Sequence, residues 1–323
     1  MAAVIAATSV CLSPLIARAQ PAAKLARVGY LGSSSPSVEP HYLEALRKEL
    51  RDLGYVEGKT IAIIPRWAEG RDERLPGLVA ELIRLDPDVI VTTGTPGAFA
   101  AKQATKTIPI VMASAGDPVR TGLVASLAQP GGNVTGNTVL GPELEGKRLQ
   151  LLKQAVPALS PVAVLWNSAN PAIKFYLEQA QAAARTLNVT LQPVVEVRGE
   201  ADLERAFSRI AAAQPHALMV LADRLLLAHR ARIVAFAASR RLPAMYPYRE
   251  FVDAGGLMSY SPSSIELFRS AARYVDKILR GARAGDLPVQ EPSKFELVIN
   301  QKTARTLQLA IPSSMLVSAE LIQ

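Results

Sequence analysis

Short apolar segments alternate with amphipathic helical segments along almost the whole chain, and this alternation constrains the fold most. Within the apolar segments, as in ARVGYLG (26–32) and PDVIVTTG (87–94), Val, Ile and Leu dominate without strict alternation with polar residues. Strands of this kind are buried on both faces, which is typical of a parallel sheet with helices on each side. The pattern therefore predicts an α/β protein built from repeated βαβ units.

The alternation runs twice, which predicts two Rossmann-like lobes. The first series contains apolar segments at 26–32, 59–68, 87–94 and 108–114. The second restarts after Gly141, with segments at 161–167, 189–197, 217–223 and 243–247. A chain of 323 residues is long enough for two domains of ordinary size. Two further strands, 255–261 and 295–300, follow this double series, with predicted helices at 265–279 and 302–309.

The first 19 residues have the character of a secretory signal peptide. Residues 1–16 are small and apolar without a charge, and Ala-Arg-Ala (17–19) precedes Gln20, as at an A-x-A cleavage site. About 15 apolar residues are too few for a comfortable membrane span, although an uncleaved anchor is the alternative. Cys11 is the only cysteine, so cleavage leaves a mature chain without disulfides. We therefore expect export to the periplasm.

Composition and motifs argue against several classes of function. The formal charge is +8, but the 36 Lys and Arg residues are spread along the chain rather than clustered as nucleic-acid binding requires. The three histidines, His41, His216 and His229, are too scattered to suggest a metal site. No phosphate loop, dinucleotide fingerprint or nucleophile elbow is present. We expect no nucleic-acid partner, no metal, no cofactor and no catalytic residues.

Polar residues follow several of the predicted strands, where open α/β sheets bind their ligands. The candidate ligand-binding residues are Ser34, Ser35, Thr93, Gly94, Thr95, Asp117, Trp166, Asn167, Asp223 and Tyr246. Any one of the Ser, Thr, Asp or Asn residues could instead cap a helix, because these residue types are the usual N-caps. Their recurrence at one edge in both series favours a cleft between the lobes.

Two ligand groups can be matched to these positions. Thr93 and Thr95 offer hydroxyls at the start of a helix, and Gly94 lets the backbone approach, which suits a carboxylate at the positive end of the helix dipole. A ligand ammonium needs a carboxylate, for which Asp223 is the first choice. Asp117 is the second choice, and it fits a helix cap at least as well.

The aromatic residues of the second series suggest a place for an apolar ligand side chain. Trp166, Tyr246 and Tyr248 all lie at predicted strand ends and could stack on an aromatic ring. Packing in the core is an equally good interpretation of Trp166. Trp67 ends an edge-like strand and fits a structural role.

Three longer segments identify a family resemblance. They are GDPVRTGLVASLAQPGGNVTG (116–136), YREFVDAGGLMSY (248–260) and FELVINQKTARTLQLAIP (295–312). On these segments the chain resembles bacterial ABC-transporter substrate-binding proteins with the type I periplasmic-binding fold. Some members of that family bind tryptophan, phenylalanine or tyrosine. The resemblance extends over nearly the whole chain after the leader.

The resemblance implies two lobes joined by three crossovers, near Asn137, Asp253 and Pro288. The first lobe would comprise 24–138 and 253–288, and the second 139–252 and 289–323. Such lobes close over a small ligand by hinge motion. The implied function is the periplasmic solute-binding component of an ABC importer, which captures a small carboxylated ligand such as an amino acid or an aromatic acid. An ABC permease in the inner membrane would be its partner, and the protein itself would be a monomer.

A different class of function stays open at this point. An exported α/β enzyme could act on a small ester or a nucleoside-like substrate, with Asp117 or Asp223 as the base.

Overall fold

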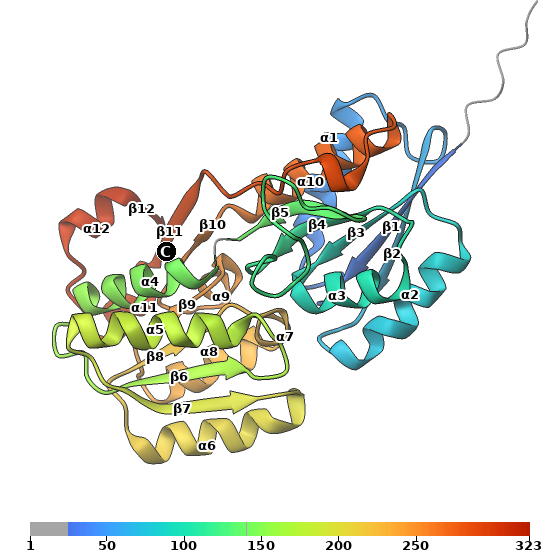
Figure 1. The fold of residues 1–323 in the computed structure, drawn as a ribbon. Coiled ribbons are helices and arrows are strands. Elements are labelled where there is room, and N and C mark those ends of the chain that lie inside the picture. Colours follow the sequence, from blue (N-terminus) through green and yellow to red (C-terminus); the bar gives the residue numbers. More distant parts are fainter. Residues whose placement is uncertain (1–24, 140) are drawn as a thin grey trace, which may run out of the picture.

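Two separate sheets form the centres of two lobes in the computed structural model, which describes residues 25–139 and 141–323 (Figure 1). The sheet of the first lobe has five parallel strands in the order β2-β1-β3-β4-β5. Its strands are β1 (Ala26–Gly32), β2 (Ile61–Trp67), β3 (Val89–Thr93), β4 (Ile110–Ala115) and β5 (Val134–Thr138). The predicted parallel α/β architecture is confirmed for this lobe.

The sheet of the second lobe has seven strands in the order β12-β11-β10-β9-β8-β6-β7. They are β6 (Val162–Asn167), β7 (Leu191–Val197), β8 (Ala217–Val220), β9 (Ala244–Tyr246), β10 (Met258–Pro262), β11 (Phe295–Asn300) and β12 (Ala319–Ile322). All described pairings in this sheet are parallel except that of β10 with β11.

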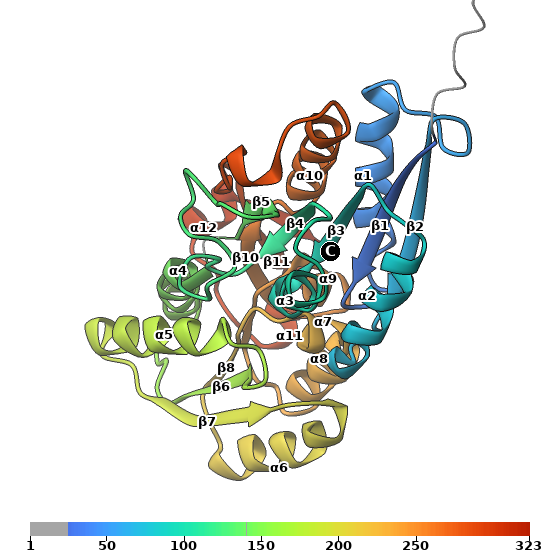
Figure 2. The same ribbon diagram turned by 45° about the vertical axis from the view of Figure 1, so that its right-hand side comes forward.

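Helices cover both faces of each sheet (Figures 1 and 2). Those of the first lobe are α1 (Pro40–Asp52), α2 (Leu75–Arg84), α3 (Gly94–Ala104) and α10 (Ser264–Leu279), with the short 3-10 helices η1 (Asp72–Arg74) and η3 (Ala284–Asp286). Those of the second lobe are α4 (Gly141–Ala155), α5 (Ile173–Leu187), α6 (Leu203–Ala213), α7 (Arg224–Ala228), α8 (Arg230–Ser239), α9 (Arg249–Asp253), α11 (Gln301–Thr306) and α12 (Ser313–Ser318), with the 3-10 helix η2 (Glu200–Asp202).

The predicted helix after β1 shows why these segments fold as they do. Leu43, Leu46 and Leu50 of α1 are buried at helical spacing, so one apolar stripe faces the sheet. The helix ends just before Gly54, whose φ of +95° is the left-handed conformation that terminates helices and that glycine adopts without a steric cost.

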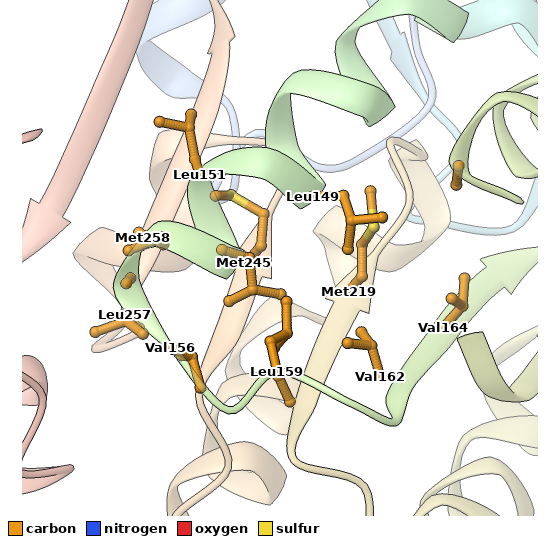
Figure 3. Packing of buried hydrophobic residues seen from close by; sticks show 14 of the residues in the cluster. Leu149, Leu151, Val156, Leu159, Val162, Val164, Met219, Met245, Leu257 and Met258 are labelled. Carbon is orange, nitrogen blue, oxygen red and sulfur yellow. The ribbon is translucent and has the colours of Figure 1, made fainter. Parts of the chain in front are cut away.

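Each lobe has a separate apolar core on each face of its sheet. In the second lobe, Figure 3 shows Leu149 of α4 close to Met219 of β8, in the same buried cluster as Met245 of β9. These strand residues are long apolar side chains on one face, which is what a helix packed against a sheet requires.

The chain crosses between the lobes after β5, after β10 and after Gln290. The second of these corrects the predicted boundary at Asp253, because β10 pairs in parallel with β9 and therefore belongs to the second sheet. The following helix α10 returns to the first lobe, where Phe268 stacks on Tyr42 of α1 with ring centroids 4.7 Å apart. Gln290 still exchanges backbone hydrogen bonds with Gly136 and Thr138, so the third crossing comes slightly later than predicted.

Within the described ranges, no helix is both long enough and apolar enough to cross a bilayer. The predicted signal peptide (1–19) and Cys11 lie outside these ranges.

Packing of α10 into the first lobe predicts a large effect of Phe268→Ala. Its ring is fully buried between Tyr42 and Tyr30, and loss of such a ring costs about 3–5 kcal/mol of unfolding free energy. Urea denaturation followed by circular dichroism measures it. Val317→Ala is the control, since Val317 is 89% exposed and a change there should stay within about 0.5 kcal/mol. Equal midpoints for the two variants would contradict the assignment of α10 to this core.

Candidate functional site

A narrow cavity lies between the lobes and is lined from both sides. From the first lobe come Gly94, Thr95, Ser114, Ala115 and Gly116; from the second come Asn170, Ile173, Tyr176, Ala222, Asp223, Arg224 and Tyr248; and Val139 of the first connection completes the lining. Its volume is about 20 Å³, which is room for about one water molecule. The structure is therefore a closed conformation in which the protein's own side chains fill the seam.

The Arg224 side chain crosses this seam. It begins at the first residue of α7 in the second lobe, and its Nη1 donates a hydrogen bond of 2.6 Å to Glu39 Oε1 in the first lobe. Its Nη2 donates to Ser114 Oγ at 2.9 Å. The guanidinium carbon lies 4.9 Å from the centre of the Tyr248 ring and 5.5 Å from that of Tyr42. These aromatic and polar contacts fix the orientation of the buried guanidinium plane.

Two buried glutamates, one from each lobe, accompany Arg224. Glu250 of α9 accepts a hydrogen bond from Tyr42 and lies 2.9 Å from the ring nitrogen of His41, through its Oε1 atom. Burial raises the pKa of Glu39 against the lowering influence of Arg224. Burial also opposes ionisation of Glu250, but its hydrogen bonds with His41 and Tyr42 bring its pKa below the ordinary value.

Several buried polar atoms around this cluster have no hydrogen-bond partner among the described residues. They are Oε2 of Glu39, Oε2 of Glu250, the Ser34 hydroxyl and the Tyr30 hydroxyl. Buried polar atoms are normally satisfied, and leaving one unsatisfied is costly. The seam therefore carries more hydrogen-bonding capacity than the closed protein uses.

The start of α3 borders the cavity as the sequence predicts. Gly94 has a φ of +74°, and a Cβ atom there would lie 3.1 Å from Arg224 Cγ, so glycine lets this side chain pass. Thr93 Oγ1 accepts from the backbone N–H of Ser33, and Thr95 Oγ1 accepts from that of Gly116. The threonine side chains thus connect neighbouring loops, and the side chain of the N-cap residue Thr93 does not cap the first N–H groups of the helix. This terminus keeps its preference for an anion.

Asp223 lies at the cavity, also as predicted, but its carboxylate is already well satisfied. It accepts hydrogen bonds from Asn167 Nδ2 (3.0 Å), Asn170 Nδ2 (2.7 Å) and the N–H of Leu225 (2.9 Å). The last of these bonds makes Asp223 the N-cap of α7. Asn167 acts behind the cavity by orienting this carboxylate.

Asp72 of η1 adds a second carboxylate across the seam. Burial, the charge of Asp223 and the charge of Glu73 together raise the pKa of Asp72 to about 7. Its segment packs tightly on the second lobe, because a Cβ atom at Gly70 would lie 2.8 Å from Ala228 Cβ. Closure therefore brings two like charges toward each other.

Of the ten predicted residues, Gly94, Thr95 and Asp223 line the cavity. Asp117, Trp166 and Tyr246 are among those that do not. Asp117 Oδ1 accepts from the N–H of Arg120 (2.9 Å), so this carboxylate stabilises a turn. Trp166 is half-buried and packs against the core of the second lobe. Tyr246 stacks on Phe251 with centroids 4.8 Å apart, on the far face of the sheet.

The expected aromatic wall of Trp166, Tyr246 and Tyr248 is therefore wrong in part. Side chains alternate between faces along a strand, and Tyr246 points into the same core as Ala244 rather than toward the cavity. Tyr248 follows the strand and does line the cavity, together with Tyr176. Burial raises the pKa of Tyr248 to about 12, so its phenol is neutral at physiological pH.

The two predicted serines shape the loop before α1. Ser34 is buried beside the seam, and Ser35 accepts backbone hydrogen bonds from Val38 and Glu39 through its carbonyl oxygen. Ser35 also pairs its hydroxyl with that of Ser37 at 2.9 Å. This loop thus places Glu39 at the start of the helix.

The sequence analysis missed Arg224, Glu39, Asn170 and Tyr176. A signal existed for Arg224, because this arginine stands between the aspartate that follows a strand and three leucines. Its partner Glu39 is 185 residues away, and no local pattern joins the two. In the part of the chain that the structure describes, no three His, Cys, Asp or Glu side chains gather in a way that could hold a metal ion.

Comparisons with known proteins agree with this architecture. A protein of Clostridioides difficile named "Tyrosine-binding protein" is 28% identical over 265 residues, which cover 81% of this chain and 75% of that protein. A solved conserved domain protein of Vibrio cholerae is 28% identical with a TM-score of 0.87, and the match covers 93% of this chain and all of that one. An ABC domain from Streptococcus pneumoniae, solved in complex with L-Trp, is 26% identical over the same shares, with a TM-score of 0.86.

The sequence model of the family described as "ABC transporter substrate binding protein" matches residues 35–322, which is most of the chain. The two lobes, the cavity at their seam and this match lead to one conclusion: the chain belongs to the family of ABC transporter substrate-binding proteins.

Proposed function

We propose that this protein is the periplasmic solute-binding component of an ABC importer and that it captures an amino acid, or a related aromatic acid, between its lobes. The observation that carries the proposal is the buried Arg224 guanidinium, which lies beside the uncapped start of α3 at a cavity lined by both lobes. The tyrosine-binding relative and the L-Trp complex support a ligand of this class. A cleaved leader would export the protein, and an ABC permease would receive the ligand.

Capture requires the lobes to part. A cavity of about 20 Å³ cannot hold an amino acid, so the ligand enters an open form and is then enclosed. The three crossings, after β5, β10 and Gln290, are the natural hinge because the chain passes from one core to the other there. A ligand that contacts both lobes binds the closed form better and shifts the population toward it.

Arg224 supplies the group that a carboxylate needs. A guanidinium has five N–H donors and matches a carboxylate through two parallel hydrogen bonds. Arg224 makes its two hydrogen bonds to the described residues across the seam, to Glu39 and Ser114, so opening of the lobes frees its donors for a ligand. Tyr176 and Tyr248 line the same cavity and offer ring surfaces for an apolar or aromatic side chain.

The alternative of an exported hydrolytic enzyme has no specific support. Asp117 caps a turn outside the cavity lining, and Asp223 caps α7 while accepting three hydrogen bonds. One relative named above is called a tyrosine-binding protein, and another was solved in complex with L-Trp.

Substitution of Arg224 tests the proposal directly. Isothermal titration with L-tyrosine, L-tryptophan, L-phenylalanine and their deaminated acids should show binding of at least one ligand by the unmodified protein. Arg224→Met should weaken that binding by about 10- to 100-fold, since hydrogen bonds to charged groups contribute about 1.5–3 kcal/mol, and Arg224→Lys should weaken it less.

Arg120→Met is the matched control. Arg120 also reaches across the seam, where it pairs with Glu178 and lies 3.9 Å from the centre of the partly exposed Phe175 ring. Exposed contacts of this kind contribute little. Its loss should change affinity less than about threefold. Failure of the unmodified protein to bind any of these ligands, or unchanged affinity in Arg224→Met, would refute the proposal.

Asp72 predicts a pH dependence of closure. Its pKa is raised in the closed form, so closure is favoured while Asp72 is protonated, and that advantage is lost as the pH rises from about 4 through about 7. Ligand affinity should therefore fall severalfold between pH 5 and pH 8. Asp72→Asn should flatten this fall in titrations at both pH values, whereas Asp286→Asn, at an exposed site, should leave it unchanged. A fall of equal size in Asp72→Asn would show that another group is responsible.

A further inference from the structure

We infer that Glu39 is a specificity-determining residue that recognises the ammonium group of the ligand, so that the cleft selects zwitterionic amino acids over carboxylic acids of the same shape. This inference rests on the proposed function, because it concerns the same site. It assigns a role to a residue that the sequence pattern did not mark.

The first step is the incomplete pairing of Glu39. Its Oε1 accepts from Arg224 Nη1 at 2.6 Å, but the other branch of the guanidinium is directed to Ser114. The Oε2 atom is fully buried and has no hydrogen-bond partner among the described residues. An arginine and a carboxylate commonly form two parallel hydrogen bonds, so this pair leaves acceptor capacity unused on Glu39 and donor capacity unused on Arg224.

The second step is the placement of the two charges on opposite lobes. Glu39 belongs to the first lobe and Arg224 to the second, so opening must separate them and present a carboxylate and a guanidinium on facing walls. A zwitterion carries the two complementary charges on neighbouring atoms. Inserted between the walls, its carboxylate meets Arg224 and its ammonium meets Glu39. The direct pair of the closed structure thus takes the place that such a ligand would fill.

The third step is the comparison with the other buried carboxylates. Asp223 already accepts three hydrogen bonds from uncharged donors. Glu250 uses its Oε1 for His41 and Tyr42, and its buried Oε2 adds negative charge near Glu39. Glu39 is the carboxylate in direct contact with the proposed anchor of the ligand carboxylate, so it is the one best placed for the adjacent ammonium.

A ligand without the ammonium meets the same site unfavourably. Its carboxylate can pair with Arg224, but doing so takes the cation away from Glu39 and leaves that buried anion uncompensated. Selection against the deaminated acid therefore follows from the same residue that selects the amino acid.

The test is titration of the full-length mature protein with L-tyrosine and L-tryptophan, and with their deaminated analogues 3-(4-hydroxyphenyl)propionate and indole-3-propionate. The unmodified protein should bind the better amino acid at least about 30-fold more tightly than its analogue. Glu39→Gln keeps the shape but removes the charge. It should weaken amino-acid binding by about 10- to 100-fold and leave the analogue unchanged or tighter, so the selectivity ratio should approach one.

Two further variants separate recognition from folding. Glu44→Gln alters an exposed residue of the same helix that pairs with Arg51, and it should keep the full selectivity ratio. Glu39→Asp keeps the charge on a shorter side chain and should keep part of the ratio. Thermal melting of each variant shows whether the fold is intact.

The outcomes distinguish the two proposals. Binding by the unmodified protein together with an unchanged ratio in Glu39→Gln would overturn the role of Glu39 alone. Equal weakening of amino acid and analogue in that variant would show that Glu39 only holds the lobes together, which also overturns it. Failure of the unmodified protein to bind any of the four compounds would overturn both this inference and the proposed function.

Discussion

The contact between Arg224 and Glu39 is the interaction on which the closed structure depends. Each charge is buried, one in each lobe, and removal of a charge from water is costly unless a partner compensates it. The pair therefore stabilises the closed form, and opening of the lobes takes each charge away from its partner. The same property makes it replaceable, because a ligand with complementary charges compensates both residues at once. Under the proposal, closure without a ligand and closure around a ligand use one set of groups.

The fold explains how these groups come to face each other. In both lobes the sheet strands end at the seam, so the first residues of α3 and α7 lie on opposite walls of one cavity. The glycine at the start of α3 leaves space for the Arg224 side chain to reach across. The lobes are connected by three crossings of the chain, and each lobe keeps its own packed cores. Recognition is therefore shared between lobes rather than built into either.

Much of the fold was predictable, because apolar runs buried on both faces of a sheet are a strong local signal. That signal does not reveal which sheet a late strand joins. The boundary near Asp253, which the family resemblance implied, placed β10 in the first lobe, and nothing in the pattern shows that β10 pairs with β9. Of the predicted site residues, Gly94, Thr95 and Asp223 line the cavity in the structure. The prediction for Tyr246 was wrong because side chains alternate between the two faces of a strand, and Tyr246 lies on the face away from the cavity. The Arg224–Glu39 pair was missed because it joins residues far apart in the chain.

The central claim is that a ligand held between the lobes replaces the direct contact of Arg224 with Glu39. A crystal structure of the protein with its amino-acid ligand tests this most directly. The account predicts a ligand carboxylate within hydrogen-bond distance of the Arg224 guanidinium, and Glu39 no longer touching Arg224. A ligand bound elsewhere, with the 2.6 Å contact between Arg224 and Glu39 still in place, would contradict it.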